Sequence, residues 1–235
     1  MIGFGRFHFA RFIRFLRKVL AIVHKDIVAE LRTKEMFSSM FVFALLVIVI
    51  FNFAFELRVA NVKQVAPGVL WVTFTFAGML GLNRSFILEK DKGCLEGLLL
   101  APVDRSAIYF GKMLGNLIFM SVVEAIVLPI FWVLFNPPLF SPALILVIVL
   151  GTLGFAGVGT LFSAIAVHTR AREVMLPILL FPIVVPLMIA AVKITGGLLD
   201  GQPLSEMRNW LNLLVGFDII FLTVSYMTFD YVVEE

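Results

Sequence analysis

Long apolar segments alternate with polar connections along this chain. Six segments each hold roughly 20 predominantly apolar residues, which is the length that an α-helix needs to cross a bilayer at about 1.5 Å per residue. No connection between them is long enough for a separate soluble domain. The pattern therefore predicts one all-α membrane domain, residues 1–235, with six transmembrane helices at about residues 36–55, 65–82, 114–135, 142–167, 174–192 and 210–229.

The segment before the first apolar stretch shows the hydrophobic period of an amphipathic helix. Between residues 11 and 32, cations recur on one helical face and apolar side chains on the other. We expect residues 1–35 to form a cytoplasmic amphipathic segment that lies in the membrane interface and contacts a cytoplasmic partner, although a basic extension that only fixes orientation is the alternative. Residues 1–10 show no regular period. The cations are Arg11, Arg14, Lys18, Lys25 and Arg32, and the apolar positions are Phe12, Leu16, Val19, Val23, Ile27 and Leu31.

Composition and charge agree with a membrane protein. Hydrophobic residues make up 61% of the chain and charged residues 15%, which excludes a soluble globular enzyme and a disordered chain. Of the 19 Lys and Arg residues, eight precede the first span, five lie between the second and third, and two lie between the fourth and fifth. Because cytoplasmic flanks carry the excess of cations, both termini are predicted to be cytoplasmic, and the basic charge does not indicate nucleic-acid binding.

The connection between the second and third spans, residues 83–113, has the clearest candidate for a partner contact. Its middle contains Leu95, Leu98 and Leu99, which share one face of a helix of one or two turns. So short a helix needs a surface to pack against, which is either the chain's own membrane face or a separate cytoplasmic protein. We expect this coupling loop to dock a separate cytoplasmic protein through Glu89, Gly93, Leu95, Glu96, Leu98, Leu99 and Pro102.

Catalytic and metal-binding motifs are missing from the sequence. There is no phosphate-binding Gly-x-x-x-x-Gly-Lys-Ser/Thr loop, no His-Glu-x-x-His, and no Cys-x-x-Cys-His haem attachment site. Cys94 is the single cysteine, and none of the three histidines falls inside a predicted span. We therefore predict no catalytic residue, no metal site and no cofactor bound by this chain.

Polar and helix-breaking residues inside the predicted spans are the remaining candidates. Glu124 and Asp218 are costly in lipid, so each is either protonated or faces a polar groove that a substrate or neighbouring subunit occupies. The fifth span contains Pro177, Pro182 and Pro186, each of which removes a backbone donor. This predicts a bent or broken helix, which serves as a hinge or is a static kink.

Four motifs in this order resemble the CcmB family, that of haem exporter protein B. The similarity covers the chain from about Phe15 to its end, and residues 1–14 fall outside it. The motifs are Pro67-Gly68 with Trp71, the loop Gly93-Cys94-Leu95-Glu96-Gly97-Leu98-Leu99-Leu100-Ala101-Pro102, the glycine-rich stretch from Leu150 to Gly154, and Arg172-Glu173-Val174-Met175-Leu176-Pro177 followed by Pro182 and Pro186.

The resemblance implies an ABC-2-type permease subunit of the bacterial inner membrane that has no ATPase of its own. It implies as partners a cytoplasmic ABC ATPase in two copies that binds ATP, a haem-handling membrane protein and a periplasmic haem chaperone. Membrane lipids and a second copy of this chain are further candidate partners. In such a complex, ATP hydrolysis drives release of the haem-loaded chaperone for cytochrome c maturation. The alternatives are the permease of another ABC-2 exporter, for lipid or polysaccharide, and an assembly scaffold without transport.

Overall fold

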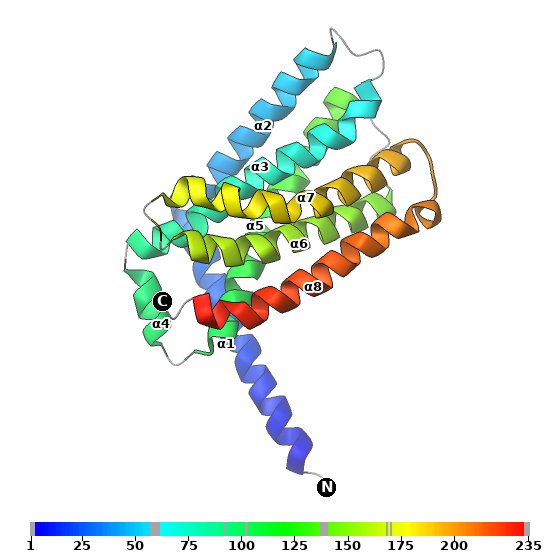
Figure 1. The fold of residues 1–235 in the computed structure, drawn as a ribbon. Helices are drawn as coiled ribbons and strands as arrows, with labels where there is room; N and C mark the ends of the chain where they lie inside the picture. Colours follow the sequence, from blue (N-terminus) through cyan, green and yellow to red (C-terminus); the bar gives the residue numbers. More distant parts are fainter. Residues whose placement is uncertain are drawn as a thin grey trace.

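The computed structural model describes residues 3–56, 62–91, 93–101, 103–136, 141–167, 169 and 171–232. The side chains of residues 3–10, 56, 62–63, 88, 91, 95–96, 99 and 172–173 lie outside this description. The described part is helical and contains no strand (Figure 1). Its elements are α1 (Gly3–Thr33), α2 (Glu35–Glu56), α3 (Val62–Asp91), α4 (Cys94–Leu100), α5 (Arg105–Phe135), α6 (Pro142–Ala166), α7 (Arg172–Leu199), the 3-10 helix η1 (Leu204–Met207) and α8 (Arg208–Val232).

Six segments are long and apolar enough to cross a membrane: α2, α3, α5, α6, α7 and η1 with α8. The predicted fold class, an all-α membrane protein with six spans, is therefore confirmed. Two of the helices extend beyond the apolar segments that revealed them. Helix α5 begins at Arg105 rather than near residue 114, and α7 ends at Leu199 rather than near residue 192. Both helices continue past the length that the hydrocarbon core requires.

Helices α3 and α6 form the centre of the bundle. In each, 72% of the most apolar window is buried, against 22–33% in the other four spanning segments. Glycines allow these two helices to approach closely, because an added Cβ at Gly159 of α6 would collide with Leu82 of α3, and one at Gly151 would collide with Trp71. The surrounding helices therefore leave most of their apolar surface facing outward, as lipid contact requires.

Helix α7 is continuous through its three prolines, so of the two forms expected, bent or broken, the broken form is wrong. The residues that α7 buries completely include Leu176, Leu180, Val184 and Leu187, which lie on one face. The prolines lie outside this face, and Pro182 and Pro186 are exposed. Packing of the buried leucine and valine face against its neighbours holds the helix together although each proline removes one backbone hydrogen bond.

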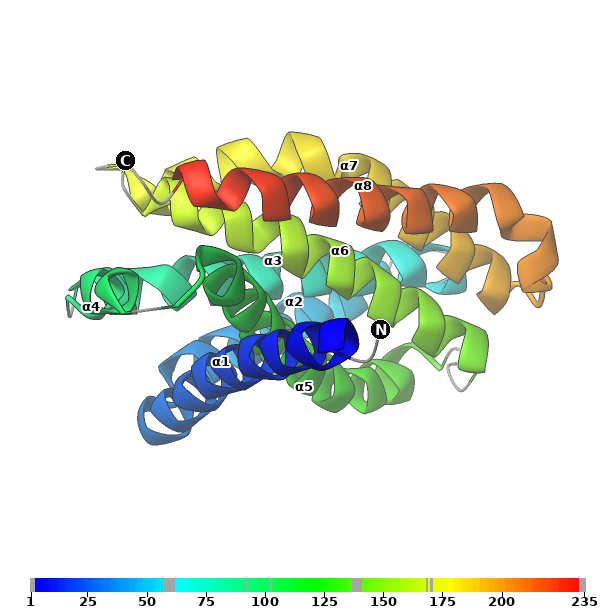
Figure 2. The ribbon, with the colours of Figure 1, turned by 90° about the horizontal axis from the view of Figure 1, so that it is seen from below.

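Helix α1 crosses the direction of the spanning helices at one end of the bundle (Figures 1 and 2). It begins at Gly3, so the irregular segment expected for residues 1–10 is helical from residue 3 onward. Val19, Ile22 and Val23 are buried where α1 contacts α5, whereas Phe12 and Leu16 on the N-terminal half remain exposed. The connection to α2 turns at one residue with a positive φ of 56°, Lys34. The predicted amphipathic helix is thus present, and only part of its apolar face is covered by protein.

Candidate functional site

Helix α4 lies outside the bundle, directly after α3 (Figure 1). The chain changes direction between the two helices near Gly93, whose φ of 65° is a conformation that glycine adopts without steric cost. Gly93 therefore has a structural reason for its place in the predicted docking loop. Pro102 and the side chains of Leu95, Glu96 and Leu99, which were also predicted to dock a partner, lie outside the described residues.

The two described leucines of α4 face in different directions. Leu98 is partly buried against a hydrophobic cluster that includes Ile22 of α1, Phe86 of α3 and Tyr109 of α5. Leu100 is 88% exposed. Leu98 thus attaches α4 to the chain's own bundle, and among the described side chains of α4, Leu100 is the apolar one left for another surface. The sequence analysis missed Leu100 because it followed only the helical face shared by Leu95, Leu98 and Leu99.

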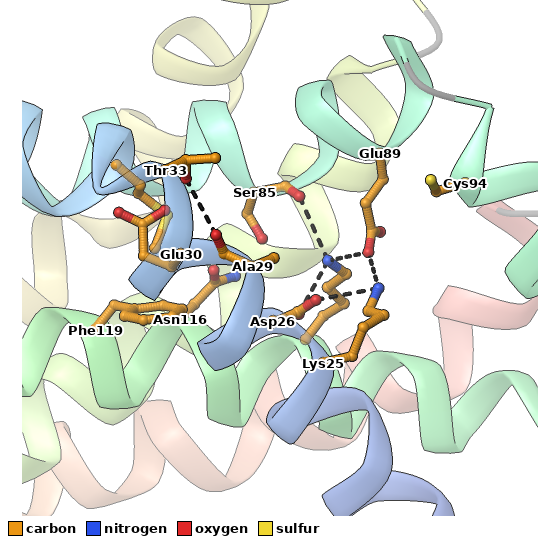
Figure 3. A pocket seen from close by; sticks show the side chains of 12 residues that line it. Lys25, Asp26, Ala29, Glu30, Thr33, Ser85, Glu89, Cys94, Asn116 and Phe119 are labelled. Atoms are coloured by element: carbon orange, nitrogen blue, oxygen red, sulfur yellow. Dashed lines mark hydrogen bonds and ion pairs between the residues drawn. The ribbon is translucent and has the colours of Figure 1, made fainter.

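A cluster of ionised side chains joins three helices beside the start of α4 (Figure 3). Lys112 of α5 has its Nζ 2.8 Å from Glu89 Oε1 on α3 and 3.0 Å from Asp26 Oδ2 on α1. Lys25 of α1 also pairs with Glu89, and its Nζ lies 3.1 Å from Asp26 Oδ1. We call these four residues the ion cluster. It connects the amphipathic helix to the helices on both sides of α4.

Burial and charge act in opposite directions on this cluster. Burial alone would raise the pKa of Glu89, but the ammonium groups of Lys112 and Lys25 outweigh burial and lower that pKa below its ordinary value. Burial likewise disfavours the charge on Lys25, yet the carboxylates of Glu89 and Asp26 outweigh it and raise the pKa of Lys25. The side chain of Lys112 is only 2% exposed and lies over the ring of Phe86, 5.4 Å from its centroid. All these contacts favour the ionised forms.

Only Glu89 of the ion cluster was a predicted site residue. Lys25 and Lys112 were counted as orienting cations, and the sequence analysis gave Asp26 no role. A signal for the cluster was nevertheless present, because Asp26 and Glu30 interrupt the cationic segment at a spacing of four residues, which places two carboxylates on one face of α1. The other members of the ion cluster, Lys112 on α5 and Glu89 on α3, are distant in sequence and could not be identified from periodicity.

A cavity of about 240 Å³ opens beside the ion cluster, between α1, the start of α2, α3 and α5 (Figure 3). Glu30 lines it and accepts a 2.7 Å hydrogen bond at Oε1 from the backbone N–H of Phe37, which fixes the turn between α1 and α2. Glu89 is 8% exposed, and its Oε2 has no hydrogen-bond partner among the described residues. The other residues that line the cavity are Lys25, Asp26, Ala29, Thr33, Met36, Ser85, Cys94, Lys112, Asn116 and Phe119.

Two further contacts fix the ends of the helices near α4. Lys90, at the end of α3, donates a 2.7 Å hydrogen bond from Nζ to the backbone oxygen of Val167, just after α6. Lys18 of α1 lies 3.4 Å from Asp104, which precedes α5. The segment that contains α4 is therefore connected at its two sides to α6 and to α1.

The polar residues predicted inside the spans lie apart from this site and against α6. Glu124 of α5 is 6% exposed, and its Oε1 accepts a 2.7 Å hydrogen bond from Thr152 Oγ1. Asp218 of α8 is 4% exposed next to Gly154, and its carboxylate oxygens have no partner among the described residues. Both side chains face protein, as their cost in lipid requires.

These features define a multi-pass membrane subunit: six spanning segments, an amphipathic helix across one end and a short helix outside the bundle. Among the described residues, no group of His, Cys, Asp and Glu side chains could hold a metal ion.

The chain belongs to the CcmB protein family, whose profile matches residues 17–234. Relatives named "Heme exporter protein B" are 27% identical over 177 residues in Rhodobacter capsulatus, covering 74% of this chain and 80% of the relative. In Pseudomonas aeruginosa the identity is 26%, covering 72% of this chain and 77% of the relative. In Paracoccus denitrificans it is also 26%, covering 80% of this chain and 87% of the relative. This confirms the family indicated by the four sequence motifs.

Proposed function

We propose that this chain is the membrane subunit of a haem-exporting ABC transporter that serves cytochrome c maturation in the bacterial inner membrane. Membership of the CcmB family and the names of the relatives support this assignment. In the proposal, haem is the cargo of the complex and ATP is hydrolysed by a separate cytoplasmic subunit present in two copies. A haem-handling membrane protein and a periplasmic haem chaperone complete the complex, and ATP turnover releases the loaded chaperone.

Helix α4 is the proposed receiver of motion from the ATPase, with both termini and α4 on the cytoplasmic side. The observation that carries this role is the packing of Leu98 on a hydrophobic cluster that includes residues of α1, α3 and α5, while Leu100 stays exposed. A partner that displaces α4 would therefore act on α3, the helix that α4 contacts most. The ion cluster would transmit the displacement, because breaking a buried pair is unfavourable and the helices move together instead.

The intramembrane candidates have a separate proposed role. Glu124 and Asp218 both lie against α6, where Thr152 donates a hydrogen bond to Glu124 and Gly154 lies against the carboxylate of Asp218. We assign them to the surface along which α5, α6 and α8 shift during the cycle. Pro177, Pro182 and Pro186 are the proposed points where α7 bends, since each lacks one backbone hydrogen bond.

The docking proposal is tested by copurification of the ATPase in mild detergent. Leu100→Asp and Glu96→Arg are expected to leave the chain inserted and folded while the ATPase is lost from the purified complex. Tyr231→Asp is the matched control, because Tyr231 is also exposed, at 74%, near the end of α8 but not on α4. Retention of the ATPase at normal stoichiometry in both α4 variants would show that α4 is not the docking element.

The haem assignment is tested separately by deleting the gene and measuring c-type cytochromes spectroscopically. We expect their loss, and restoration by the unmodified chain. A deletion strain with normal c-type cytochromes would contradict the haem assignment without affecting the docking proposal.

A further inference from the structure

The ionised side chains that line the cavity beside the ion cluster have an excess of one negative charge, which one bound cation would neutralise. Two ammonium groups and three carboxylates line it, so the ionised lining carries a net charge of one negative unit. The ammonium groups belong to Lys25 and Lys112, and the carboxylates to Asp26, Glu30 and Glu89. The Oε2 atom of Glu89 is the free acceptor, because it is buried and has no hydrogen-bond partner among the described residues. A bound N–H donor would satisfy it.

The same cavity offers a site for an anion near its mouth. Lys25 is exposed there and pairs with two carboxylates, Asp26 and Glu89. An ammonium group has three donors, which leaves one for a ligand. Ala29 and Thr33, one and two turns further along α1, are exposed at the rim. An ammonium group deep in the cavity would thus pair with the carboxylate of Glu89, and a phosphate at the rim would pair with the ammonium group of Lys25.

The apolar part of the lining indicates an amphiphile rather than a small ion. Met36 and Phe119 lie in the membrane-length segments of α2 and α5. Glu89 lies just beyond the apolar segment of α3, which ends at Ile87. The cavity therefore lies where headgroups meet acyl chains, with its charged part on the headgroup side and its apolar part on the acyl side.

We propose that this cavity binds one aminophospholipid of the phosphatidylethanolamine type. Its primary ammonium group donates to Glu89 Oε2, its phosphate pairs with Lys25, and the start of its acyl chains contacts Met36 and Phe119. Phosphatidylcholine cannot donate hydrogen bonds to Glu89, since its nitrogen is fully methylated. Phosphatidylglycerol has no cation. The bound lipid fills the space between α1 and the bundle and so holds α1 in place.

Native mass spectrometry of the delipidated full-length chain tests this proposal. The protein is mixed with equal amounts of the three lipids carrying identical acyl chains, and retained adducts are counted. Charge-assisted hydrogen bonds to a buried carboxylate predict a preference on the order of tenfold for phosphatidylethanolamine over phosphatidylcholine. Equal retention of the three lipids, or preferred retention of phosphatidylglycerol or phosphatidylcholine, would overturn the proposal.

Two variants locate the preference in this cavity. Ala29→Trp fills it from the rim and is expected to abolish the preference, and Thr33→Trp does the same one turn later along α1. Leu31→Trp is the control on the same helix, because Leu31 is 66% exposed and does not line the cavity. Thermal unfolding in detergent identifies which variants are folded. A folded Ala29→Trp or Thr33→Trp protein that keeps the full preference would place the lipid elsewhere and refute the assignment.

Discussion

Lys112 and Glu89 form an ion pair, 2.8 Å between Nζ and Oε1, where both side chains are almost closed to solvent. Lys112 belongs to α5 and Glu89 to the last turn of α3, so the pair connects the two helices that flank α4. Asp26 adds α1 to the same ammonium group at 3.0 Å. Three helices therefore meet at one cation, and this arrangement makes the position of α1 depend on the ends of α3 and α5 that flank α4.

The Lys112 pair can be tested by removing one charge and then both. We expect Lys112→Met to lower the free energy of unfolding by roughly 3–5 kcal/mol, because it leaves Glu89 and Asp26 with too little buried positive charge. Lys112→Met with Glu89→Met should recover much of the loss, since Lys25 and Asp26 still pair. Thermal unfolding in detergent measures both effects.

The matched control for this pair is Arg84→Met. Arg84 pairs with Glu35 at 2.7 Å, but both side chains are about half exposed, so we expect a change below roughly 1 kcal/mol. A Lys112→Met protein that unfolds like Arg84→Met would show that the ion cluster contributes no more than a surface pair.

Acid should weaken the ion cluster through Glu89. Its pKa is lowered in the folded chain, so its contribution to stability is complete above the ordinary value of 4.5 and is lost as the pH falls through the lower folded value. At neutral pH we expect Glu89→Gln to be less stable than the unmodified chain. The difference in unfolding temperature between the two proteins should shrink as the pH falls below 4.5, and parallel curves would contradict the pKa assignment.

Close packing of α6 on α8 makes Gly154 sensitive to substitution. An added Cβ at Gly154 would collide with the carboxylate of Asp218, so we expect Gly154→Ala to destabilise the protein by roughly 1–3 kcal/mol and Asp218→Ala in the same chain to relieve part of that loss. Gly216→Ala is the control, because nothing lies within 4 Å of its added Cβ, and its helix should gain up to about 1 kcal/mol. The measurement is the unfolding temperature of the three variants. Equal unfolding temperatures for Gly154→Ala and Gly216→Ala would contradict this packing.

The spans and the amphipathic helix could be predicted because segment length and period are local properties of the sequence. The ion cluster could not, because Lys25 and Glu89 are 64 positions apart and nothing local shows that they meet. Lys112 illustrates the difficulty: a lysine near a span end counts as an orienting charge until its burial is known. The continuity of α7 likewise depends on packing by neighbouring helices, which a proline count does not include.

The side of the membrane on which α4 lies is the most direct test of the account. Cys94 is the chain's only cysteine and is exposed at the start of α4, so no engineered cysteine is needed. A membrane-impermeant maleimide is applied to intact spheroplasts and to inverted membrane vesicles, with and without the coexpressed ATPase. We predict labelling of Cys94 in the inverted vesicles only, and less of it when the ATPase is bound. Labelling from the periplasmic side would contradict both the orientation and the docking role of α4.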